Sequence, residues 1–143
     1  ETLTSLPVRE RFWSVRVGAV LEALVSRHEP EYGLSLLEFK GQLLSVPIQS
    51  AAIGQSVRVH ILSSDVSLVI GRTDSTSSVL NILDATVLEI REINQSSVDV
   101  LLDIGAPLIA SITRKSLAIL GLKPGLRVYA HIKTVALNED LTE

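Results

Sequence analysis

Six polar residues in the second half of the chain have types and spacing that could bind an anion. They are Ser78, Asn81, Thr113, Ser116, Lys133 and Thr134. Hydroxyl and amide groups donate hydrogen bonds, and a lysine adds a compact positive charge. None of the six is a carboxylate, which would repel an anion. This donor set predicts a binding site for a small oxyanion.

Two of these residues lie where the sequence predicts the start of a short helix. Thr113 is a favourable N-cap, Leu117 and Leu120 supply an apolar face, and Gly121 followed by Pro124 ends the helix. A helix start presents unpaired backbone N–H groups and the positive end of the helix dipole, and both favour an anion. The predicted helix therefore strengthens the case for an oxyanion site.

A purely structural alternative accounts for the same residues without a ligand. Thr113 would then be only a helix cap, and Lys133 only a solvated residue on a strand whose other face is buried. Ser78 and Asn81 would be ordinary polar residues of a loop. The pattern alone leaves both interpretations open.

Strand signals dominate the rest of the chain and occur twice in the same order. Alternating and β-branched apolar residues predict strands at 15–25, 34–39, 43–48, 57–61 and 66–70, and again at 82–93, 98–104, 108–112, 126–132 and 135–137. Residues 19–25 align with 81–87, and 57–68 align with 126–137 without a gap. The chain is therefore interpreted as two copies of one β unit of about 60 residues.

This order of elements predicts a mostly all-β fold of two tandem OB-like Greek-key barrels, the second with one short helix. The expected division is a connector from a preceding domain at 1–14, a first unit at 15–70, a linker at 71–77, a second unit at 78–138 and a tail at 139–143. The absence of any methionine indicates a piece cut from a longer protein.

The two copies differ at the polar residues of the predicted site. In the first copy Arg16, Ala19, Ser64 and Asp65 take the places of Ser78, Asn81, Lys133 and Thr134. Only the second copy has a full donor set, and Asp65 would repel an oxyanion. We therefore expect one site per chain, in the second copy.

Composition argues against several other classes of function. The formal net charge is −3 and only 3% of residues are aromatic, so neither a basic stripe nor a stacking platform for nucleic acid is present. There is no cysteine, and the three histidines lack metal-ligand spacing, so we expect neither a metal site nor catalytic residues. No apolar run reaches the roughly 18 residues of a membrane span, which predicts a cytoplasmic location.

The same residues resemble the Mop, or molbindin, domain of the TOBE group, whose pattern has S-x-R-N-x-L, T-x-x-S, L-G-L-K-x-G and I-K-[SAT] in that order. Here the corresponding stretches are SVLNIL at 78–83, ITRKS at 112–116, LGLKPG at 120–125 and IKT at 132–134. The resemblance covers residues 77–137. It identifies the second copy as a Mop unit and the first as a TOBE/OB-like unit.

The first copy resembles the segment that precedes the Mop domain in ATP-binding subunits of molybdate ABC importers. The chain has no G-x-x-x-x-G-K-[ST] motif, so nucleotide chemistry would belong to an ATPase domain outside it. By this resemblance the fragment is a regulatory domain rather than an enzyme. The full-length parent would be peripheral to the inner membrane and would contact the transmembrane permease subunit through its ATPase domain.

The resemblance also implies a ligand and the residues that hold it. Mop domains bind molybdate or tungstate between domains or subunits, and the matching positions are Ser78, Thr113, Ser116, Lys133 and Thr134, with Asn81 bracing the loop. Leu80 stands where the motif has arginine. Loss of that guanidinium removes a charge-assisted contact of about 1.5 to 3 kcal/mol and predicts weaker binding.

Three functions follow as expectations. In the first, a homodimer senses intracellular molybdate or tungstate and regulates the importer. In the second, the oxyanion site has decayed and the region only dimerises and supports the same ATPase. In the third, the two copies form an effector or storage domain.

Overall fold

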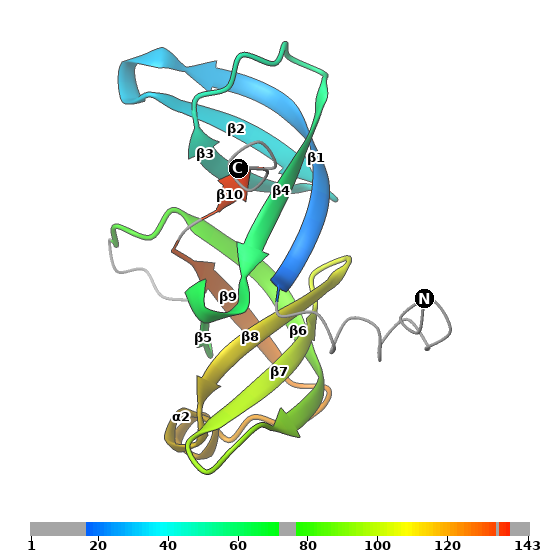
Figure 1. The fold of residues 1–143 in the computed structure, drawn as a ribbon, viewed down its shortest axis with the longest axis vertical. Coiled ribbons are helices and arrows are strands. Elements are labelled where there is room, and N and C mark those ends of the chain that lie inside the picture. The colour runs from blue at the N-terminus through cyan, green and yellow to red at the C-terminus, as the bar shows by residue number, and fades with distance from the viewer. Residues whose placement is uncertain (1–16, 72–76, 134, 138–143) are drawn as a thin grey trace.

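Two five-stranded antiparallel sheets make up the part of the chain that the computed structural model describes, residues 17–71, 77–133 and 135–137 (Figure 1). The first sheet has the order β10-β4-β1-β2-β3. Its strands are β1 (Val17–Glu29), β2 (Leu34–Phe39), β3 (Gln42–Pro47), β4 (Ser56–Leu62) and β10 (Ala136–Leu137). The second sheet has the order β5-β9-β6-β7-β8. Its strands are β5 (Val66–Val69), β6 (Asn81–Glu92), β7 (Ser97–Asp103), β8 (Pro107–Thr113) and β9 (Arg127–Ile132).

The predicted mostly-β fold with one short helix is confirmed. Helix α2 (Arg114–Leu120) begins after the N-cap Thr113 and ends at Gly121, which adopts a left-handed φ of 63°. The described residues also include two 3₁₀ turns, η2 (Pro30–Tyr32) and η3 (Ser63–Asp65). Among the described residues, no helix has both the length and the apolar character needed to cross a membrane.

The two sequence repeats exchange their last strands. Strand β5 ends the first repeat, yet it pairs with β9 of the second sheet, with Val66 opposite Ile132. Strand β10 ends the second repeat, yet it pairs with β4 of the first sheet, with Ala136 opposite His60. Each sheet therefore contains one strand from the other repeat, so strand pairing crosses the predicted linker at 71–77 in both directions. The domain limits proposed from the repeat remain predictions.

Alternation along the strands explains how the core forms. In β6, Leu83, Ala85 and Val87 face inward and are buried, whereas the residues between them are partly or fully exposed. Most buried apolar residues of both sheets form one continuous cluster, which includes Leu44 and Leu83, and Leu101 and Ile109 form a small second cluster. The two repeats therefore share a core.

Polar side chains add further connections between the sheets. The Gln42 Oε1 atom accepts a hydrogen bond of 2.8 Å from the Asp84 backbone N–H, and Gln42 Nε2 donates to the Ile104 carbonyl at 3.3 Å. The Ser111 hydroxyl donates to the Ser63 hydroxyl at 2.9 Å. These contacts fix the β2–β3 hairpin and η3 against the second sheet.

The two-residue turn between β2 and β3 provides a stability prediction. Lys40 has φ 51° and Gly41 has φ 81°, so both residues lie in the left-handed region. Lysine is strained there, whereas asparagine tolerates this conformation. We expect Lys40→Asn to raise the free energy of unfolding by about 0.5 to 1 kcal/mol in urea denaturation. Lys40→Val should lower it, because β-branched residues are disfavoured at positive φ; equal stability of the two variants would contradict this account.

Candidate functional site

Three of the six predicted site residues lie around one cavity of about 270 Å³. Asn81 is the first residue of β6, Ser78 lies three residues before it, and Lys133 directly follows β9. The described residues that line this cavity are Leu34, Ser45, Val46, Pro47, Ser78, Leu80, Asn81, Lys133 and Val135. We call it the Lys133 cavity.

Lys133 supplies the only charged side chain among the described residues that line the Lys133 cavity. Its backbone N–H donates to the Asp65 carbonyl at 3.0 Å, which fixes the chain where it leaves β9. The Lys133 side chain is exposed. The ammonium group is therefore available to an anion that enters from solvent.

Asn81 acts as a brace between the two sheets. Its side chain is only 6% exposed, its Oδ1 atom accepts from the Ser45 backbone N–H at 2.6 Å, and its Nδ2 atom donates to the Ser45 carbonyl at 3.1 Å. The amide thus pairs with β3 as a peptide group of a neighbouring strand would. Asn81 is on β6 and pairs with Ile132 of β9. Ile132 is next to Lys133, so Asn81 fixes both sides of the Lys133 cavity.

Replacement of Asn81 should therefore affect both stability and the site. Asn81→Ala leaves the Ser45 N–H and C=O without their side-chain partner, and we expect a loss of about 2 kcal/mol in the free energy of unfolding. In addition, the Ser45 amide should lose protection from hydrogen exchange. The exposed substitution Ser77→Ala serves as the control and should change stability by no more than about 0.5 kcal/mol. Unchanged protection at Ser45 in Asn81→Ala would refute the brace.

Thr113 and Ser116 lie at a different place, at the end of β8 and the start of α2. Thr113 Oγ1 accepts from the Ser116 backbone N–H at 3.0 Å and donates to the Ser116 hydroxyl at 3.0 Å. They line a second cavity of about 280 Å³ between the edge strands β5 and β8. The predicted N-cap is confirmed, but the structure does not place this pair beside Lys133 within one chain. Thr134, the sixth predicted residue, lies outside the described residues.

Sequence reasoning missed the contribution of the first repeat. Ser45, Val46 and Pro47 line the Lys133 cavity, and Ser64 and Ser67 line the cavity beside Thr113. Comparison of the two copies drew attention only to residues that differ between them. The one available signal was Asn81 itself, since a buried amide at the start of a strand needs backbone partners.

A family model for the TOBE domain matches residues 77–138. Molybdenum import ATP-binding proteins called ModC match a larger part of the chain. The protein from Albidiferax ferrireducens is 46% identical over 121 residues, which are 84% of this chain and 32% of the relative. A protein from Azotobacter vinelandii is 43% identical over 122 residues, 84% of this chain and 34% of the relative. The protein from Pseudomonas aeruginosa is 41% identical over 124 residues, with the same shares. The chain thus spans about a third of the length of these relatives.

A solved structure has a similar fold. The cytoplasmic molybdate-binding protein ModG, crystallised with molybdate bound, superposes with a TM-score of 0.74 over 86% of this chain and 96% of its own. Its sequence identity is 23%, so the likeness concerns the fold. Together with the family match and the ModC relatives, it leads to one conclusion. Residues 77–138 belong to the TOBE family, within a chain that matches the C-terminal region of ModC molybdate import proteins.

Proposed function

We propose that this chain binds molybdate or tungstate in a site that two copies of the chain complete together. The proposal rests on one observation: the predicted hydrogen-bond donors lie in two separate cavities of the same chain. Ser78 and Lys133 line one cavity, whereas Thr113 and Ser116 line another. A second copy that brings its hydroxyl pair to the Lys133 cavity would surround an oxyanion with one ammonium group and several hydroxyl donors.

The chemistry of the Lys133 cavity supports an anionic ligand. No carboxylate lies among its described lining residues, and its volume of about 270 Å³ is several times the roughly 30 Å³ that a water molecule occupies. The net charge of −3 repels anions weakly at long range, so local donors must provide the affinity. Because one lysine balances only part of the charge of a dianion, the hydroxyl groups must contribute the rest of the binding.

The relatives suggest what the binding is for. The relatives described above are molybdenum import ATP-binding proteins, and the structural neighbour is a molybdate-binding protein. In this proposal the chain is the regulatory region of a ModC-type subunit in a homodimer. Intracellular oxyanion binds between the two copies and changes the activity of the importer, which includes a transmembrane permease. Such regulation requires the ligand to bind one transporter state more tightly than the other.

A second candidate is a dimerisation and support module of the same ATPase without a working oxyanion site. Leu80 favours it, because this apolar side chain is 63% exposed at the edge of the Lys133 cavity, where a guanidinium would strengthen anion binding. The two candidates share the dimer and differ only in the ligand.

Calorimetric titration with molybdate, with sulfate as the control, separates these candidates. The proposal predicts saturable binding of one oxyanion per chain, with weaker binding of sulfate. At a free molybdate concentration of about 100 times Kd, linkage predicts an increase of about 2.7 kcal/mol in the free energy of unfolding. A dimer that shows neither heat of binding nor thermal stabilisation with molybdate would overturn the proposal and favour the support module.

A further inference from the structure

One hydroxyl group in the Lys133 cavity comes from the first repeat. It belongs to Ser45, which lines this cavity together with Lys133 and Ser78. Ser45 lies within β3, between the buried residues Leu44 and Val46. Because side chains alternate along a strand, the Ser45 side chain lies on the face away from the core. The cavity therefore has a hydrogen-bond donor from outside the part of the chain that matches the TOBE model, residues 77–138.

The backbone of Ser45 is held on both edges of β3. On one edge, Ser45 lies opposite Leu36 of β2. On the other edge, Asn81 Oδ1 accepts from the Ser45 backbone N–H at 2.6 Å, and Asn81 Nδ2 donates to the Ser45 carbonyl at 3.1 Å. Both bonds with Asn81 use the backbone of Ser45, which leaves its hydroxyl to the cavity.

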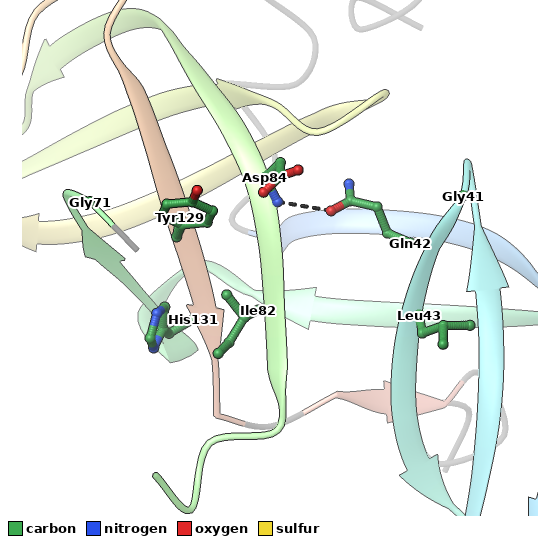
Figure 2. Close-up of a pocket in the computed structure, with 8 residues that line it drawn as sticks. All are labelled: Gly41, Gln42, Leu43, Gly71, Ile82, Asp84, Tyr129 and His131. Carbon is green, nitrogen blue, oxygen red and sulfur yellow. Dashed lines mark hydrogen bonds between the residues drawn. The ribbon is translucent and has the colours of Figure 1, made fainter. Parts of the chain in front are cut away.

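A second side-chain amide holds β3 against β6. Figure 2 shows the Gln42 side chain crossing toward β6, where Gln42 Oε1 accepts from the Asp84 backbone N–H at 2.8 Å. Gln42 thus reaches from β3 to the backbone of β6, and Asn81 reaches from β6 to the backbone of β3. The two links are three residues apart on each strand, at 42 and 45 and at 81 and 84. Together they restrict rotation of β3 about either link, so the Cα atom of Ser45 has a fixed position beside the cavity.

The two donors Ser45 and Lys133 differ in how far they can move. The Lys133 side chain is exposed, and its ammonium group is carried on a flexible four-carbon stem. A serine hydroxyl is separated from its Cα atom by one rotatable bond, which has staggered positions only. The Lys133 cavity thus combines a movable charge with a hydroxyl whose position is set by the backbone.

Fixed donors distinguish anions by size. Molybdate and tungstate are larger tetrahedral dianions than sulfate, because their oxygen atoms lie farther from the central atom. A hydrogen bond weakens when its distance or angle departs from the favourable range, so a fixed donor binds best the anion whose oxygen atoms reach it. A movable ammonium group can follow the oxygen atoms of either anion. Discrimination by size therefore requires the fixed hydroxyl rather than the lysine.

We propose that the Ser45 hydroxyl binds the oxyanion and determines the preference of the site for molybdate or tungstate over sulfate. Lys133 attracts each of these dianions, and the fixed hydroxyl favours the larger ones. Leu80 lines the same cavity and its side chain has no donor atom, which increases the share of the binding that hydroxyl groups must supply. The inference rests on the function proposed above and gives the first repeat a direct part in selecting the ligand.

Titration of Ser45→Ala with molybdate and with sulfate tests this role. Loss of one hydrogen bond to a charged ligand should raise the molybdate Kd about tenfold. The sulfate Kd, obtained by competition with molybdate where direct titration is too weak, should change much less. The ratio of the sulfate Kd to the molybdate Kd should therefore fall, whereas Lys133→Ala should raise both Kd values and leave their ratio nearly unchanged. A natural ratio in Ser45→Ala would overturn the proposal.

Two further variants separate a binding role from a structural one. Ser45→Thr keeps a hydroxyl at the same position and should retain the molybdate affinity and the ratio of the natural chain. Ser50→Ala removes an exposed hydroxyl from the loop after β3, outside both cavities of the proposed site, and should change neither value. In Ser45→Ala the backbone amide at position 45 should keep its protection from hydrogen exchange, because Asn81 binds the backbone there. Equal losses of affinity in Ser45→Thr and Ser45→Ala would contradict a role of the hydroxyl.

The outcomes also separate this inference from the proposed function. A natural chain that binds no molybdate overturns both. If the natural chain binds molybdate and Ser45→Ala binds it equally well, the proposed function stands and the role of Ser45 is overturned.

Discussion

Gly18→Ala should lower the free energy of unfolding by about 3 kcal/mol or more, the largest stability effect that we expect from a single methyl group. A Cβ atom at Gly18 would lie 2.8 Å from the carbonyl oxygens of Ile109 and Ile61 and 2.9 Å from the backbone nitrogen of Ser63. All three atoms belong to the backbone, so no flexible side chain can move aside. Gly18 therefore permits β1 to pass close to β8 and η3.

Urea denaturation of the purified variant measures this effect. Glu22→Gln changes an exposed residue of the same strand and should remain within about 0.5 kcal/mol of the natural chain. Because Gly18 lies where β1 joins the two sheets, we also expect Gly18→Ala to expose apolar surface to a hydrophobic dye. A variant as stable as the natural chain would show that β1 does not pass as close to β8 as the structure indicates.

Lys133→Ala should raise the Kd for molybdate about 10- to 100-fold. A hydrogen bond to a charged group contributes about 1.5 to 3 kcal/mol, and each 1.4 kcal/mol corresponds to a factor of ten. Lys133 is the only charged residue among the described lining of its cavity, so no neighbouring side chain there can replace it.

The matched control is Arg27→Ala, which removes one positive charge from an exposed ion pair with Glu29 and lines none of the cavities described above. Calorimetry should give nearly the same molybdate affinity for Arg27→Ala as for the natural chain. If the two variants lose affinity equally, net charge rather than the site governs binding. If Lys133→Ala loses none, the oxyanion binds elsewhere.

Much of the fold could be predicted from the sequence, because short strands with one buried face leave an alternating pattern. The helix could also be predicted, because Thr113 and Gly121 are typical of helix ends and are the N-cap and the C-cap of α2. The exchange of β5 and β10 could not be predicted. The two repeats have similar sequences, so β4 and β9 offer similar edges to either final strand, and only packing in three dimensions decides between them.

The candidate site was predictable in its residue types and not in its geometry. Ser78 and Lys133 line one cavity, whereas Thr113 and Ser116 line another, so the six residues remain a predicted site. Spacing along a chain gives the separation of residues on one element and not the distance between elements. Asn81 was predicted to brace the loop beside the site; the identity of its partner, the Ser45 backbone 36 residues away in sequence, could not be predicted.

A mixing experiment tests the shared oxyanion site most directly. Lys133→Ala chains and Thr113→Ala chains are each titrated with molybdate and then titrated after subunit exchange. If two copies share each site, a dimer made only of one variant has two defective sites. A mixed dimer has one intact site, formed by Lys133 of one copy and Thr113 of the other, so mixing should restore high-affinity binding at one of its two sites. Failure to restore binding, with both variants folded and mixed dimers present, would contradict the account.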